Sequence, residues 1–249
     1  MDKADEQLML IGGTALLYAP AGAGVERQAA LDSILYAQLV ANKEAGSRFA
    51  DHDAWYDAYR SALRRLGWIK LASTYDQRQL GQPTRSTRLQ PLDAWLKVRS
   101  IQQQAVLAAF AADLRQSAAG VAHLKKFSVQ DQAGGSQVVI ELGLLKPGPV
   151  LDLCSITLHT ETPLSGLSLA QLLSDQVLKG EAAFNGISLA LDNARFQHPR
   201  EALHALMQTK DGQRGYRFHL HSSHTGARSA SSPRYSTCSP RALLVAVAC

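Results

Sequence analysis

The spacing of apolar residues changes near Gly120, and this change limits the fold of the chain more than any other sequence feature. Before it, apolar residues recur three and four positions apart over residues 25–45 and 53–66, which predicts two amphipathic helices. A third helix, apolar on most of its surface, is predicted over residues 91–116. After Gly120 the pattern favours strands, which we expect over residues 127–130, 137–145, 150–160, 182–192 and 216–220.

This order of elements predicts an α+β fold, in which an N-terminal helical half packs on a C-terminal small mixed or antiparallel sheet with short helices. We place the helical half at residues 1–125 and the α+β half at residues 126–221. Residues 222–249 change abruptly to Ser, Thr, Ala, Arg and Pro without periodicity, so we expect a disordered tail. An error in the reading frame of the gene would leave the same kind of aberrant tail, and that alternative stays open.

Positive charge is concentrated in residues 60–99, where nine basic and two acidic residues give +7, against +5 for the whole chain. Arg60 and Arg64 are one helical turn apart and share a face of the predicted helix. Residues 1–59 contain four basic and nine acidic residues, a balance of −5. We therefore expect part of the basic charge to be neutralised within the chain. Trp68 and Trp95 lie among apolar residues of this segment, so we expect both to belong to the core.

The polar segment from Ser73 to Gln90 is rich in arginine and amide side chains, which predicts a long exposed loop. Exposed guanidinium groups attract carboxylates and phosphates. No helix-turn-helix spacing, zinc-knuckle cysteines or RNA-binding motif accompanies them, so an acidic protein is a better candidate partner than nucleic acid. The candidate partner-binding residues are Arg78, Arg85 and Arg88.

Other motifs give no cofactor or metal site. The glycine-containing loop at residues 19–24 lacks the Gly-Lys-Ser/Thr ending of a phosphate-binding loop. His159 and Glu161 alternate onto one face of a predicted strand, but two ligands do not make a site. Three more histidines and two cysteines are too loosely spaced for a metal assignment: His219, His221, His224, Cys238 and Cys249. We expect no cofactor and no metal.

A serine-type hydrolase is one alternative function. Ser168 lies in a Gly-Leu-Ser-Leu-Ala pentad, which departs from the Gly-x-Ser-x-Gly nucleophile elbow at its last position. Catalysis would also require a base and an acid, for which His198 or His204 with Asp192 are the candidates. The alternative to a catalytic role is a structural one, in which Ser168 is the N-cap of a helix.

The compartment follows from weaker signals. Three cysteines without paired spacing favour a reducing environment. The apolar run Leu8–Ala19 is too short to span a bilayer, and the acidic residues before it argue against a secretory signal. We expect a cytoplasmic protein without a transmembrane segment, leaving open export without a cleavable signal. A membrane-active or toxin-like accessory protein, with residues 8–18 as an insertion element, is a second alternative.

The leading interpretation is a non-enzymatic binding or assembly protein of bacterial type. It would contact an acidic partner through the basic loop, because the concentrated charge is the strongest functional signal and no catalytic constellation accompanies it.

Overall fold

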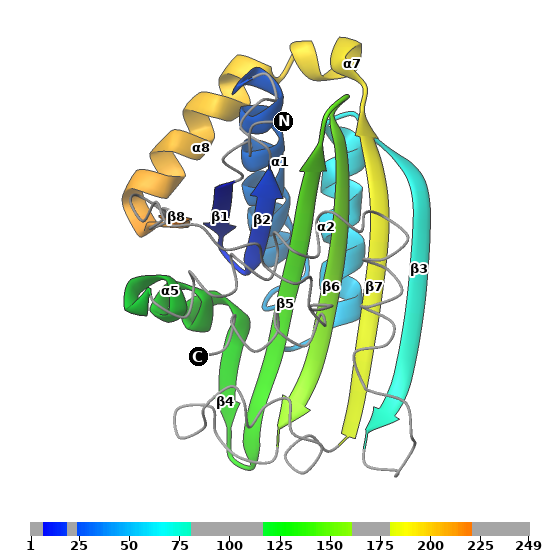
Figure 1. The fold of residues 1–249 in the computed structure, drawn as a ribbon, viewed down its shortest axis with the longest axis vertical. Helices are drawn as coiled ribbons and strands as arrows, with labels where there is room; N and C mark the ends of the chain where they lie inside the picture. Colours follow the sequence, from blue (N-terminus) through cyan, green and yellow to red (C-terminus); the bar gives the residue numbers. More distant parts are fainter. Residues whose placement is uncertain (1–6, 19–23, 81–116, 161–179, 221–249) are drawn as a thin grey trace, which may run out of the picture.

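The computed structural model describes residues 7–18, 24–80, 117–160 and 180–220, and its centre is one eight-stranded sheet (Figure 1). The strand order is β3-β7-β6-β5-β2-β1-β8, with β4 pairing to β5 beside this path. All strand pairs are antiparallel except β2 with β5. The strands are β1 (Gln7–Ile11), β2 (Thr14–Tyr18), β3 (Trp68–Leu80), β4 (Val129–Gln132), β5 (Gly135–Lys146), β6 (Val150–Thr160), β7 (Gly180–Leu191) and β8 (Arg217–Leu220).

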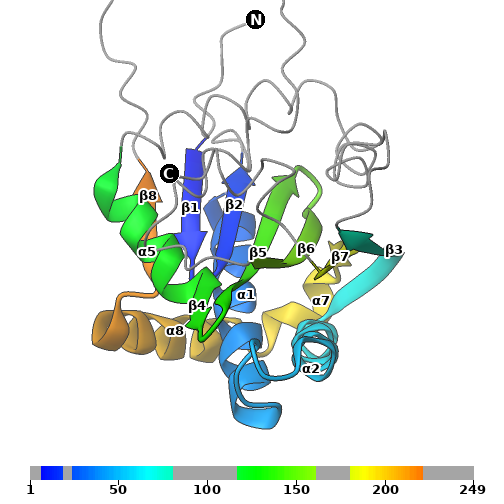
Figure 2. The same cartoon turned by 90° about the horizontal axis from the view of Figure 1, so that it is seen from below.

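Helices cover one face of this sheet, where α1, α2 and α8 lie side by side (Figure 2). Helix α5 packs against β1, β4, β5 and β8, and the short helix α7 leads into α8. The described helices are α1 (Gly24–Glu44), α2 (His52–Arg65), α5 (Ala118–Ser128), α7 (Asn193–Gln197) and α8 (Arg200–Arg214).

The predicted α+β arrangement of an N-terminal helical half packed on a C-terminal sheet is wrong. Strands β1, β2 and β3 come from the first 80 residues and join the same sheet as β4–β8. The β1–β2 hairpin escaped prediction because its residues are buried on both faces, so the sequence shows a continuous apolar run instead of alternation. The molecule is a mixed α/β structure around a mostly antiparallel sheet.

The predicted loop from Ser73 to Gln90 is also wrong in its first part, because β3 continues to Leu80 in antiparallel pairing with β7. The segment is polar and resembles a loop in composition, but strand formation here is set by pairing with a neighbour rather than by intrinsic propensity. The remainder of the predicted loop lies outside the described residues. So do the predicted helix over residues 91–116 and the predicted tail over residues 222–249.

The two predicted helices at the start of the chain are confirmed as α1 and α2. Helix α2 begins as its sequence indicates, because the Asp51 carboxylate accepts a hydrogen bond of 2.9 Å from the backbone N–H of Ala54. It ends before Gly67, whose φ of +94° lies in the left-handed region that glycine tolerates best. This ending turns the chain directly into β3.

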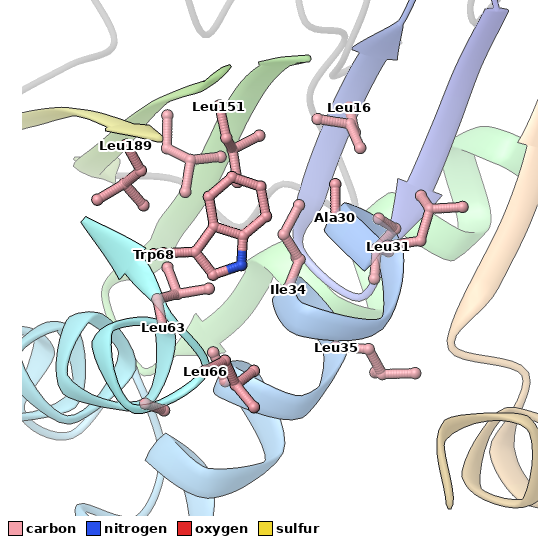
Figure 3. Close-up of a cluster of buried hydrophobic side chains, with 14 of the residues drawn as sticks. Leu16, Ala30, Leu31, Ile34, Leu35, Leu63, Leu66, Trp68, Leu151 and Leu189 are labelled. Atoms are coloured by element: carbon pink, nitrogen blue, oxygen red, sulfur yellow. The ribbon is translucent and has the colours of Figure 1, made fainter. Parts of the chain in front are cut away.

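The core between these helices and the sheet is centred on Trp68, which is 1% exposed, as the sequence predicted. Its ring lies where α1, α2 and the strands meet (Figure 3). Burial of so large a side chain stabilises the junction of α2 with β3 by about 3 kcal/mol or more. The side chains drawn around it include Ile34, Leu63, Leu66, Leu151 and Leu189.

Candidate functional site

A groove of about 450 Å³ lies between α2 and the outer strand pair β3–β7. Helix α2 supplies one wall, because residues three and four positions apart project from the same helix face. Lys70 of β3 stands at the other side, and Ile187 and Leu189 of β7 form an apolar floor. The four residues from α2 are Asp57, Arg60, Ser61 and Arg64.

Three cations and one carboxylate line this groove, so its walls carry a net charge of +2. Arg60 forms an ion pair with Asp57 and lies 5.0 Å over the ring of Tyr56. Arg64 donates a hydrogen bond of 2.9 Å from Nη2 to Ser61 Oγ. Within the described ranges, neither Arg64 nor Lys70 meets a carboxylate. The groove therefore presents positive charge to solvent beside an apolar surface, which suits an anionic group attached to an aliphatic one.

Part of the basic segment is neutralised within the chain, as its sequence context predicted. Arg65 lies 3.0 Å from Glu44 of α1, in addition to the ion pair between Arg60 and Asp57. Pairs this exposed contribute little to stability, about 0–1 kcal/mol each. Among the groove cations, whose side chains are all described, Arg64 and Lys70 are therefore the two without a carboxylate partner in the described residues.

The three predicted partner-binding residues are not brought together within the described part of the chain. Arg78 lies in β3, opposite Ala182 of β7, while Arg85 and Arg88 lie outside the described residues. The sequence did show that Arg60 and Arg64 share a helix face. Lys70 belongs to the same basic stretch, but only the turn at Gly67 places it opposite α2. The apolar floor could not be predicted, because β7 lies more than 100 residues away along the chain.

A second polar cluster is buried under the sheet around Glu141 of β5. Thr14 Oγ1 and Tyr59 Oη each donate a hydrogen bond of 2.8 Å to Glu141 Oε1. Gln38 Nε2 donates to Thr14 Oγ1 over 2.7 Å. Burial raises the pKa of Glu141 to about 7, although these hydrogen bonds and nearby Arg48 oppose the rise. The contacts link α1, α2, β2 and β5, which is a structural role.

Arg48 and His52 complete this cluster. Burial lowers the pKa of Arg48 to about 10, and burial together with Arg48 lowers the pKa of His52 to about 4. His52 Nε2 lies 3.3 Å from Ser155 Oγ, which is a base beside a hydroxyl. Ser155 is only 3% exposed and does not line the groove beside α2. The hydroxyl of this pair is therefore buried.

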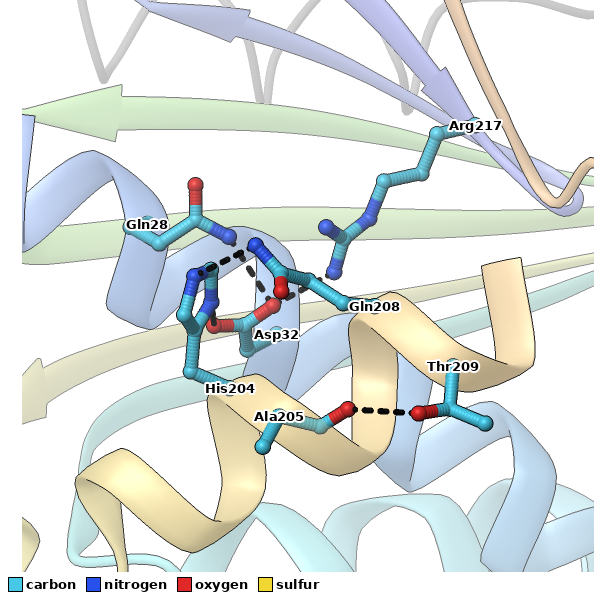
Figure 4. Close-up of polar contacts among 7 residues, drawn as sticks. All are labelled: Gln28, Asp32, His204, Ala205, Gln208, Thr209 and Arg217. Atoms are coloured by element: carbon cyan, nitrogen blue, oxygen red, sulfur yellow. Dashed lines mark hydrogen bonds and ion pairs between the residues drawn. The ribbon is translucent and has the colours of Figure 1, made fainter. Parts of the chain in front are cut away.

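A third cluster surrounds Asp32 of α1, whose side chain is 3% exposed (Figure 4). Its Oδ1 accepts hydrogen bonds from Arg217 Nη2 over 2.6 Å and from Gln28 Nε2 over 2.9 Å. Its Oδ2 lies 2.8 Å from His204 Nδ1. The other ring nitrogen of His204 is occupied by Gln208, at 2.9 Å. The cluster joins α1, α8 and β8 and has no open base.

The predicted hydrolase residues are not assembled into a triad in the described structure. His204 pairs with Asp32, whereas Asp192 accepts hydrogen bonds from the backbone of Ala194 and Arg195 at the start of α7. His198 is exposed beyond the end of α7. Ser168 lies outside the described residues, so its role as nucleophile or N-cap stays a prediction.

The described ranges also bear on metal binding and on membrane-spanning helices. No group of three or more His, Cys, Asp or Glu side chains there is arranged to hold a metal ion. No helix among the described residues has both the length and the apolar character needed to cross a membrane. The run Leu8–Tyr18, considered as an insertion element, forms the buried hairpin β1–β2 inside the sheet.

The groove beside α2 is thus a described site in which cations from two elements converge and remain accessible. Comparison with known proteins adds no further assignment: no family model, no curated protein and no solved structure matches this chain.

Proposed function

We propose that the chain is a non-enzymatic binding or assembly protein that contacts an acidic protein partner through the basic groove. One observation carries this proposal: Arg60, Arg64 and Lys70, from two different elements, line one groove that holds a single carboxylate, Asp57. An uncompensated positive surface attracts carboxylates and accelerates their encounter with it. The unpaired spacing of the cysteines supports a reducing compartment, and we propose the cytoplasm.

Arg78, Arg85 and Arg88 remain candidate contacts in this proposal. Arg78 follows Lys70 on the same strand, and the other two follow shortly along the chain. A partner bound at Lys70 would need to extend about 26 Å along β3 to reach the backbone at Arg78. Reversal of these three charges, with the groove residues left intact, measures how far the contact extends.

Fluorescence anisotropy with labelled octa-glutamate tests the proposal. The double variant Arg60→Glu/Arg64→Glu should weaken binding by about tenfold or more, because two attractive contacts become repulsive. A single-reversal control is Lys210→Glu on α8, an exposed lysine that forms no ion pair within the described residues. It changes the net charge by −2, against −4 for the double variant. Equal affinities for the wild type, the double variant and the control would contradict the proposal.

A further inference from the structure

Strand β3 is an unusually long edge. It is the outermost strand in the sheet order and, among the described strands, pairs only with β7. Its 13 residues compare with about 5–6 in a typical strand. One side of β3 therefore presents a row of backbone N–H and C=O groups to which no described strand bonds, which is a template for strand addition.

The start of this edge carries exposed apolar side chains. Ile69 is 50% exposed and Leu71 is 59% exposed, and they are two of the four large exposed apolar side chains of the described residues. Leu71 coincides with the shift in pairing register between Lys70 and Ala72, which marks a bulge. Lys70 and this bulge limit unspecific pairing at the edge, while Ile69 and Leu71 leave apolar surface exposed beside them.

The charge beside this edge selects the kind of segment that fits it. Lys70 faces the helix side, where it shares the groove with Arg60 and Arg64. A strand added next to β3 would lie about 4.8 Å away, with alternate side chains directed toward that groove. Acidic residues at the alternate positions would reach the cations, while apolar residues between them would lie on the opposite face, the face of Ile69.

A second copy of the chain is the poorer occupant. Two copies pairing through residues 68–73, the part of β3 beside the groove, would bring their Lys70 side chains together, because Asp76 lies further along the strand. An acidic segment from another protein would avoid that repulsion, and its carboxylates would neutralise the positive charge of the groove.

We infer that the partner presents an extended segment of alternating acidic and apolar residues, which adds as a strand to the outer edge of β3 and places its carboxylates against Arg60, Arg64 and Lys70. This inference rests on the proposed function and names the partner's conformation. Main-chain hydrogen bonds supply affinity in this mode of recognition, and the alternate side chains supply specificity.

Two peptides test the inference on the full chain: acetyl-(Glu-Val)₄-amide and the same peptide N-methylated at every residue. The second keeps all carboxylates but loses the backbone N–H donor of every residue. We expect N-methylation to weaken binding by about tenfold or more, because several backbone hydrogen bonds are lost. We also expect the unmethylated peptide alone to slow hydrogen exchange in fragments covering residues 68–80.

Each other outcome overturns the inference in a recognisable way. Equal binding of both peptides, with loss of both in Arg60→Glu/Arg64→Glu, would refute strand addition while the proposed acidic contact stands. Binding of neither peptide by the wild type would contradict strand addition, and octa-glutamate binding would then decide whether the proposed acidic contact stands. A concentration-dependent dimer that already protects the amides of β3 without peptide would assign the edge to a second copy.

Discussion

The groove beside α2 and the cluster around Asp32 use the same kinds of side chain in opposite ways. At Asp32 one buried carboxylate meets Arg217, His204 and Gln28, so each of its oxygens has a partner. The groove is lined by three cations and one exposed carboxylate, Asp57, which pairs with Arg60. Buried charge must be compensated within the chain, whereas exposed charge can be left for another molecule. The first arrangement stabilises the fold, and the second is available for binding.

Asp32→Ala tests the structural side of this comparison and should have the largest effect. It leaves the Arg217 side chain, which is 11% exposed, without its carboxylate. Loss of one partner of a buried pair costs about 3–5 kcal/mol. Urea unfolding should register this loss, while octa-glutamate binding by the protein that remains folded should not change. A stability loss no larger than that of an exposed substitution would contradict the structural role of the cluster.

The pH dependence of stability around Glu141 should show the next largest effect. Burial raises the pKa of Glu141 from 4.5 to about 7, so the folded state binds more protons than the unfolded state between these values. The contribution of Glu141 to the free energy of unfolding therefore decreases as pH rises from about 4.5 to 7. Burial lowers the pKa of His52 from 6.5 to about 4, so its contribution strengthens as pH rises from about 4 to 6.5. The two slopes oppose each other over most of this range.

Single variants should separate these slopes. His52→Gln removes the contribution that grows between about pH 4 and 6.5. Over this interval the free energy of unfolding of the variant should fall by about 3 kcal/mol relative to that of the wild type, since one pKa unit corresponds to about 1.4 kcal/mol. Glu141→Gln should give the opposite slope, with stability rising between about pH 4 and 6.5. Unfolding at a series of pH values checks both. If all three proteins share one pH profile, the burial of these charges is not coupled to folding.

Asp57→Ala should have the smallest effect and sharpens the binding side of the comparison. Its side chain is 70% exposed, so removal should change stability by less than about 0.5 kcal/mol. It releases Arg60 and raises the net charge of the groove, so octa-glutamate should bind about twofold more tightly. Weaker binding would show that Asp57 orients Arg60 rather than competing with the ligand, and Lys210→Glu again serves as the control.

The elements predicted correctly were those determined by local signals. Helix α2 has regular apolar spacing, an N-cap at Asp51 and a glycine at position 67, all contiguous in the sequence. The core position of Trp68 was also predicted, although Ile69 and Leu71, the apolar neighbours on which that prediction rested, are exposed. Strand β3 was missed because its polar residues become a strand only through pairing with β7, more than 100 residues away.

The groove could be predicted only in part for a similar reason. Arg60 and Arg64 were placed on one helix face from their spacing alone. Their relation to Lys70 depends on the turn at Gly67, and their relation to Ile187 and Leu189 depends on the sheet order. The sequence therefore located the concentration of positive charge. Only the fold shows which of these cations form ion pairs within the described residues and which do not.

The most direct test is to measure unfolding and octa-glutamate binding on the same preparation of Arg60→Glu/Arg64→Glu. If the groove charge serves binding, affinity should fall by about tenfold while the free energy of unfolding stays within about 1 kcal/mol of the wild type. Unchanged affinity with a large loss of stability would contradict this account, because the groove cations would then serve the fold, as those around Asp32 do.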